Sequence, residues 1–202
     1  MKKFSLLAAL VGLLLSPHMA PAATYRPDAV DDTYFATGTG FTAYATPTDV
    51  VCIWGGTGRV VYVSTFWIGP QSSSTSLGAW YYVKRSAPDT GGTATTITPV
   101  SYDSNNIAPV ATVQAYSAAP TLGTSLGNIR IVLEQSMVLT AGMQAVGLDT
   151  FGANTFAQIP TGISLRQAVT LRSASEGLCL NFNGASLPGG FTSTWGVEWT
   201  EH

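Results

Sequence analysis

Histidine is almost absent from this chain, since its two copies are His18 and the last residue, His202. Catalytic Ser-His-Asp and Cys-His arrangements need an imidazole that a third group orients, and a residue at a chain end is poorly placed for that role. Histidine is also a usual ligand of protein-bound zinc. The shortage therefore argues against a serine or cysteine hydrolase and against a histidine-based zinc site.

Charge is scarce as well, because Asp, Glu, Lys and Arg together make up only 10% of the residues. There are 9 basic and 11 acidic residues, and no cluster of Lys and Arg is available to follow a phosphate backbone. We therefore expect no nucleic-acid partner. Lys84 is the sole lysine after Lys3, which leaves little scope for amine catalysis.

Carboxylates are the remaining candidates for chemistry. Glu134, Glu176, Glu198 and Glu201 could in principle supply the pair that glycoside hydrolysis needs, but any two surface acids meet that description. The acids of "PDAVDD", residues 27–32, lack the spacing of a calcium-binding loop. The sequence thus predicts no enzyme, no cofactor and no metal site.

Apolar runs long enough to span a bilayer are missing, and the longest one stands at the N-terminus. Lys2 and Lys3 precede an apolar segment at 4–15, and "APA" at 20–22 has the pattern of a cleavage site. Residues 1–22 are therefore predicted to be a signal peptide that is cut after Ala22. We expect an exported protein, periplasmic, cell-surface or extracellular, with no membrane span in the mature chain.

Helical periodicity is also lacking, whereas short apolar runs recur between Gly, Pro, Asn and Asp. This pattern predicts an all-β fold, a single jelly-roll-like β-sandwich at 47–202 preceded by an N-terminal arm or edge strand at 23–46. The expected strands are Val50–Trp54, Val60–Ile68, Leu77–Lys84, Val110–Tyr116, Ile129–Leu139, Ala145–Leu148, Ile163–Leu171, Leu178–Phe182 and Trp195–Trp199.

Alternation within the runs predicts which side chains face the core. In "LGAWYYVK" at 77–84, Lys84 marks the solvent side, which places Trp80 and Tyr82 outward with it. In "RVVYVSTFWI" at 59–68, a bulge near Ser64 and Thr65 would keep the aliphatic residues and Phe66 inward. In the closing strand, Trp195, Val197 and Trp199 are expected inside.

That interpretation gives four outward aromatic residues, which are Tyr62, Trp67, Trp80 and Tyr82. Aromatic rings on a solvent-facing sheet can stack on sugars or anchor a protein partner. The alternative is that the N-terminal arm, a neighbouring sheet or another subunit covers this face. The four residues are the candidate interface or ligand face.

The two cysteines, Cys52 and Cys179, are an even number in an exported chain, which allows a disulfide. Alternation argues against it, because Cys52 shares a face with Val50 and Trp54 whereas Cys179 shares one with asparagines. A bridge would close a long loop and stabilise the fold by about 4–5 kcal/mol in the chain-entropy model. The bridged and the free state both stay open.

The hydroxyl-rich stretch "VKRSAPDTGGTATTITPVSYDSNN" at 83–106 looks at first like an active-site loop. It contains no base and no oriented nucleophile, while Pro88-Asp89 and Gly91-Gly92 are typical of turns. We interpret it as a connection or crossover between strands.

Several stretches resemble one group of proteins: "TPTD" before an apolar strand and Gly turn, "KRSAPDTGGTATT", "YDSNNIAPVATVQAYSAAPTLGTSLGNIR", "EGLCLNFNGASLP" and "VEWTE". They are similar to small all-β structural proteins of tailed phages and prophages, over most of residues 45–201. The resemblance implies a virion or tail-associated β-sandwich without enzymatic activity.

The sequence therefore predicts a non-enzymatic structural or attachment protein, a virion or tail-like component or an exported relative of one. By analogy with phage appendage proteins we expect a homo-oligomer, with a trimer favoured, that contacts other assembly subunits or a surface glycan. The alternative is a secreted carbohydrate-binding, lectin-like domain.

Overall fold

The computed structural model describes residues 31–40, 46–71, 76–136, 149–152, 168–184 and 192–202. The predicted signal peptide lies outside these ranges, as do the expected strand Ala145–Leu148 and the first part of Ile163–Leu171. The described residues contain strands and no helix, so the all-β prediction is confirmed. Accordingly, none of the described residues belongs to a helix that could cross a membrane.

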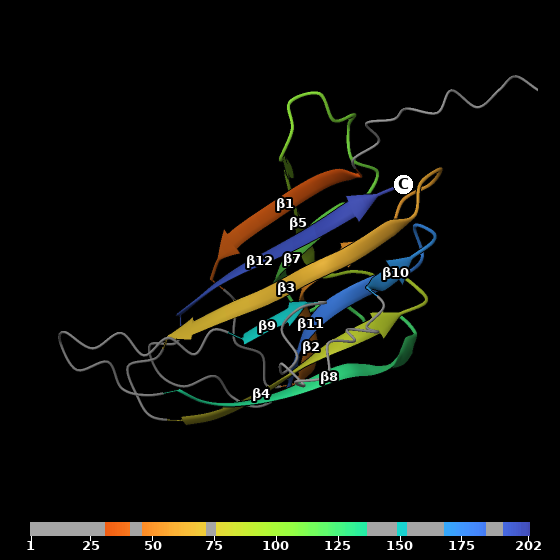
Figure 1. Cartoon of the computed structure of the whole chain (residues 1–202). Helices are drawn as coiled ribbons and strands as arrows, with labels where there is room; N and C mark the ends of the chain where they lie inside the picture. The colour runs from red at the N-terminus through yellow and green to blue at the C-terminus, as the bar shows by residue number, and fades with distance from the viewer. Residues whose placement is uncertain (1–30, 41–45, 72–75, 137–148, 153–167, 185–191) are drawn as a thin grey trace, which may run out of the picture. The chain divides into compact units, whose positions relative to one another are not determined.

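The strands form two antiparallel sheets (Figure 1). Sheet A contains, in spatial order, β10 (Val169–Leu171), β3 (Val61–Gln71), β12 (Thr192–Glu201), β1 (Asp32–Thr39) and β6 (Val100–Ser101), and β9 (Asp149–Gly152) also pairs with β3. Sheet B contains β5 (Thr93–Ile97), β7 (Thr112–Ala118), β2 (Pro47–Trp54), β11 (Gly177–Asn183), β4 (Ser76–Arg85) and β8 (Ser125–Ser136).

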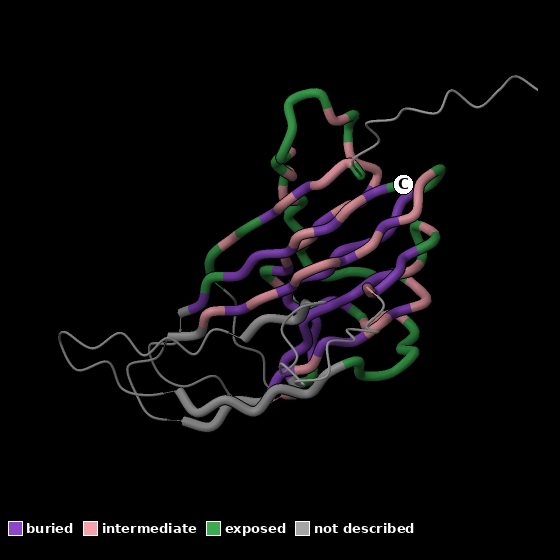
Figure 2. The backbone as a smooth tube through the Cα atoms, in the orientation of Figure 1, coloured by how far each residue is buried: buried purple, intermediate pink, exposed green. Residues whose placement is uncertain are grey.

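The two sheets pack face to face around one apolar core to which both contribute. Phe66 of sheet A meets Tyr82 of sheet B at 5.4 Å between ring centroids, and the Tyr82 hydroxyl donates to the Phe66 carbonyl at 3.1 Å. Buried positions alternate with partly exposed ones along β1, β12 and β3 (Figure 2), as expected for strands with one face on a core. The β-sandwich prediction is confirmed, and the jelly-roll remains a prediction.

Within the predicted arm or edge strand at 23–46, residues 32–39 form β1. This strand pairs with β12 along its whole length and with the two-residue β6 on its other side. Tyr34 and Ala36 of β1 are buried in the core. Residues 32–39 are therefore an integral part of sheet A.

The expected bulge in β3 is present. Thr65 pairs with Glu198 while Val63 pairs with Trp199, so Ser64 is the extra residue. The side chains of Val61, Val63, Phe66 and Ile68 are all buried, and Tyr62 and Trp67 lie on the opposite face with intermediate exposure. The predicted orientation of β12 is also confirmed, since Trp195, Val197 and Trp199 are buried.

The orientation predicted for β4 is wrong. Trp80 and Tyr82 lie in the core, with 2% and 0% of their surface exposed. Lys84 shares their face but stands at the end of the sandwich, where its ammonium reaches the Thr170 carbonyl at 2.8 Å and Glu176 at 3.4 Å. A long side chain can thus share a face with core residues and still reach solvent, which made Lys84 a misleading marker.

A pair of tryptophan substitutions tests this correction. Trp80→Ala should lower the free energy of unfolding by about 3–5 kcal/mol, because it empties a buried site against Phe182, whose ring lies 5.7 Å away. Trp67→Ala, on the outer face of sheet A, should cost about 1 kcal/mol. Chemical denaturation followed by far-UV circular dichroism measures both. Equal losses for the two variants would contradict the assigned orientation of β4.

Candidate functional site

The outer face of sheet A carries the candidate functional surface, which we call the aromatic face. It consists of Phe35 on β1, Tyr62 and Trp67 on β3, Glu198 on β12, and Tyr102 just after β6. Tyr102 is 64% exposed, and the other four are of intermediate exposure. These side chains lie on one face because they alternate with the buried residues of their strands.

Trp67 lies over the neighbouring strand. It pairs with Gly196 of β12, and a Cβ atom at position 196 would come within 2.5–2.7 Å of the indole Nε1, Cε2 and Cζ2 atoms. The ring occupies the space that any larger residue at 196 would need. Glycine at this cross-strand position therefore lets the indole lie across the sheet instead of projecting away from it.

Glu198 lies two residues further along β12, on the same face as Gly196. Its Oε1 atom accepts from the Ser64 hydroxyl at 3.2 Å and its Oε2 atom from the Tyr102 hydroxyl at 2.9 Å. The hydrogen bond to Glu198, then burial, raise the pKa of Tyr102. Phe35 meets the Tyr102 ring edge-on at 6.4 Å, so the carboxylate is held in a fixed position beside aromatic rings.

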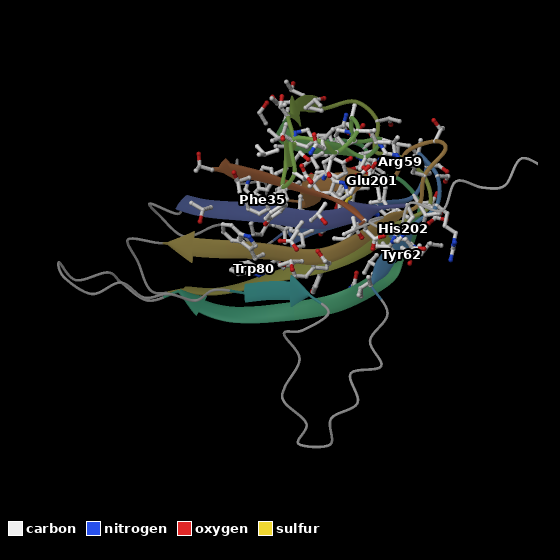
Figure 3. The ribbon with its side chains drawn as sticks, turned by 45° about the horizontal axis from the view of Figure 1, so that its top comes forward. Phe35, Arg59, Tyr62, Trp80, Glu201 and His202 are labelled. Atoms are coloured by element: carbon white, nitrogen blue, oxygen red, sulfur yellow. A yellow bond between two sulfur atoms is a disulfide. The ribbon has the colours of Figure 1, made fainter. Side chains whose placement is uncertain are left out.

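The other end of the aromatic face is closed by the C-terminal residue. The His202 ring meets Tyr62 edge-on at 5.0 Å (Figure 3). Its Nδ1 atom lies 2.9 Å from Asp31, and both side chains are about half exposed, at 50% and 43%. This histidine is a surface group with a carboxylate partner, and no nucleophile is among these contacts.

The four aromatic residues predicted as one surface are thus divided between two environments. The structure places Tyr62 and Trp67 on the aromatic face and Trp80 and Tyr82 in the core. Sequence reasoning missed Phe35, Tyr102 and the role of Glu198. Phe35 alternates with Tyr34 and Ala36 in a segment that was predicted to be an arm or edge strand without assigning its faces, so a signal was present there.

The outer face of sheet B is different, because its part around Cys52 and Arg85 is buried beside two loops, residues 86–92 and 119–124. Thr90 and Thr121 exchange backbone hydrogen bonds of 2.9 and 2.7 Å, and the Ser86 N–H donates to Thr124 at 2.9 Å. Gly92, with φ of 68°, comes so close to the second loop that a Cβ would lie 2.7 Å from the Ala118 carbonyl. The stretch at 83–106, predicted to be only a connection, contains the strands β5 and β6, so the prediction missed both; its residues 86–92 form a loop on this face.

Beneath these loops lies a cluster of charged and polar groups, which we call the Asp49 cluster. Arg85 binds Asp49 in a bidentate manner, with Nε–Oδ2 and Nη2–Oδ1 distances of 2.8 Å each. The Asn181 amide donates to the same carboxylate at 2.5 Å. Asp89 accepts the Gly123 N–H at 2.8 Å and lies 4.0 Å from Arg85. Two buried carboxylates thus share one cation.

Cys52 and Cys179 form a disulfide within this cluster. They are direct partners in the β2–β11 register, with Cα atoms 4.1 Å apart. The alternation argument against the bridge is wrong, because Val51 and Ile53 face the core and Cys52 therefore faces outward together with Cys179. The strand is bulged at Val50, which disturbs the simple alternation on which the argument rested.

Burial, and next the Asp49 carboxylate, raise the pKa of Asp89 to about 7. Burial, and next the charge of Asp89, raise the pKa of Tyr116 to about 12. Oxygen atoms of Asp49 and Asp89 lie 3.8 and 3.7 Å from the Cys52 sulfur. Two carboxylates and two sulfurs within 4.8 Å of one another could suggest a metal site, but sulfurs joined in a disulfide are not thiolate ligands. We assign the cluster a structural role.

Glu201 is the centre of a third polar group, at the end of β12. Its buried carboxylate accepts the backbone N–H groups of Val110 and Ala111 and the Trp199 indole N–H at 2.9–3.1 Å. Arg59 completes the set at 2.9 Å and also contacts Asp32 at 3.2 Å. Figure 3 shows Arg59 and Glu201 side by side. Every oxygen of this carboxylate has donors, so its role is also structural.

Comparisons with protein-family models, with curated proteins and with solved structures found no match to this chain.

The Asp49 cluster predicts a pH dependence of stability. An acid with a raised pKa in the folded state holds a proton that the unfolded chain releases, so stability falls as pH rises from about 3.8 to about 7. Asp89→Asn keeps the acceptor for Gly123 and removes this titration. The stability of the variant relative to the wild type should therefore increase across that window and level off above it.

Urea denaturation at a series of pH values measures this difference, with Asp103→Asn, an exposed acid, as the control. A difference between Asp89→Asn and wild type that does not change with pH would contradict the assignment.

Glu201→Gln should lower the free energy of unfolding by roughly 3 kcal/mol, because it leaves Arg59 without its buried counter-ion and removes one charge-assisted acceptor. Glu198→Gln on the same strand is the matched control and should cost less than about 1 kcal/mol. Thermal unfolding of the two variants distinguishes them. A loss for Glu201→Gln no larger than that for Glu198→Gln would show that the carboxylate does not hold the fold.

Proposed function

We propose that this chain is a non-enzymatic attachment component of an exported or virion-associated assembly, and that the aromatic face is the surface that contacts its target. The observation that carries the proposal is the aromatic face itself. Trp67 lies across Gly196, next to a carboxylate that two hydroxyl groups hold in place. Aromatic rings of intermediate exposure on a single sheet face are typical of recognition surfaces.

Three of the acids that could have served catalysis, Glu176, Glu198 and Glu201, have other partners. Glu201 is saturated by backbone and side-chain donors, and Glu176 accepts the Arg172 N–H at 3.2 Å and pairs with Lys84. Glu198 is bound by Ser64 and Tyr102. These contacts support structural roles for Glu176 and Glu201 and a binding role for Glu198 over a catalytic one.

The proposal includes a homo-oligomer, with a trimer favoured, and assigns its interface to sheet B. Among the described strands, β8 is the last of that sheet, and its exposed side chains include Leu126, 61% exposed, and Ile129, 41% exposed. An edge strand with exposed apolar side chains favours pairing with another chain. A second copy at β8 would leave the aromatic face on sheet A available for the target.

Light scattering of the purified protein at tens of micromolar tests this arrangement. The wild type should be trimeric, the double variant Leu126→Lys and Ile129→Lys should be monomeric, and Trp67→Ala should remain trimeric. The lysines introduce like charges at the proposed interface, whereas Trp67 lies on the other sheet.

A wild type that is strictly monomeric would refute the assembly. A Trp67→Ala variant that becomes monomeric while the β8 variant stays assembled would show instead that the aromatic face is the subunit interface.

A further inference from the structure

We propose that the ligand of the aromatic face is a neutral carbohydrate, with one sugar ring stacked on Trp67 and its hydroxyl groups donating to Glu198. This inference rests on the proposed function, because it names the chemical class that the same surface takes. Three features of the surface support it. They are the position of the Trp67 ring, the hydrogen-bond acceptors of Glu198, and the scarcity of charged side chains.

The first feature is the position of Trp67. The indole covers Gly196 and so lies across β12, on the sheet surface. A tryptophan ring held against a sheet offers an apolar surface to the C–H groups of a sugar, and little side-chain entropy remains to be lost on binding.

The second feature is the acceptor beside that ring. Glu198 lies two residues from Gly196 on the same strand face, which is about 7 Å along β12. Oε2 receives the Tyr102 hydroxyl at 2.9 Å, whereas the single Ser64 hydroxyl proton is shared between Oε1 at 3.2 Å and the Glu198 backbone carbonyl at 3.0 Å. Each carboxylate oxygen can therefore accept a further hydrogen bond. A sugar stacked on Trp67 would present hydroxyl groups that can donate to the Glu198 carboxylate.

The third feature is charge. The described outward positions of β1, β3 and β12 carry one charged side chain, Glu198, among hydroxyl residues. These hydroxyl residues are Thr33, Thr37, Thr39, Ser64, Thr65, Thr194 and Thr200. His202, beside Tyr62, lies with its Nδ1 atom 2.9 Å from Asp31. A face with one negative charge disfavours acidic glycans, phosphates and nucleic acids and is compatible with an uncharged polyhydroxyl ligand.

The test is binding of the purified full chain to a panel of neutral hexose and N-acetylhexosamine oligosaccharides and of uronic-acid oligosaccharides, followed by calorimetric titration of the best binder. We expect a neutral oligosaccharide to bind. Trp67→Ala should weaken that binding by about tenfold or more, since it removes the stacking surface. Glu198→Gln should weaken it by about fivefold, because a charged acceptor is replaced by a neutral one.

Gly196→Ala gives a positional test, because the added methyl group must displace the indole while Trp67 itself is retained. We expect a loss of binding close to that of Trp67→Ala. Leu126→Ala, on sheet B, is the matched control and should bind like the wild type. A cooperative thermal transition well above the assay temperature identifies the variants that remain folded.

Three results would overturn the inference: no panel member binds the wild type at millimolar concentration, Trp67→Ala and Glu198→Gln bind as well as the wild type, or acidic oligosaccharides bind more tightly than neutral ones. If the wild type is a trimer that binds no sugar, the carbohydrate inference fails and the attachment proposal is retained. If the wild type is a monomer that binds sugar through Trp67, the proposed assembly fails and the carbohydrate inference is retained.

Discussion

The buried carboxylate of Glu201 is the interaction on which the joining of the two sheets depends. It stands at the end of β12 in sheet A and accepts backbone N–H groups at Val110 and Ala111, where the chain leads into β7 of sheet B. Arg59, on the connection from β2 to β3, binds it as well and extends to Asp32 of β1. Apolar packing is not directional, whereas this group of charge-assisted hydrogen bonds fixes how the segments meet.

The two sheets differ in what their outer faces do. Sheet B buries part of its outer face beside the loops at 86–92 and 119–124, and the charged groups there pair with one another. Sheet A keeps aromatic side chains of intermediate exposure and one carboxylate on its outer face. The two outer faces therefore differ in what covers them, and this asymmetry is the reason for placing the proposed recognition surface on sheet A.

Much of the fold could be predicted from the sequence, because alternation and turn residues are local signals. β12 and the bulge in β3 followed from the order of apolar residues alone. The orientation of β4 did not, since Lys84 reaches solvent from the inner face at the end of the sandwich. Neither did the disulfide or the Asp49 cluster, because they depend on pairing between β2 and β11, which are far apart in sequence, and on loops that cover a second face. Two of the four predicted surface aromatic residues, Tyr62 and Trp67, lie on an outer face, and the other two, Trp80 and Tyr82, lie in the core. Alternation separates the two faces of a strand, but tertiary contacts decide which face is buried.

The disulfide has a consequence for the topology of the molecule. It joins residues 127 positions apart, so every strand from β3 to β10 lies within one closed covalent ring. β1 precedes this ring and β12 follows it, and these two tails pair with each other over eight residue positions in sheet A. The segment from Cys52 to Cys179 is thus a closed covalent ring, and the strands before and after it, β1 and β12, are held to each other by noncovalent pairing. A single backbone cleavage inside the ring would leave one covalently connected molecule. A cleavage between β1 and Cys52, or between Cys179 and β12, would instead leave that strand attached only by noncovalent contacts.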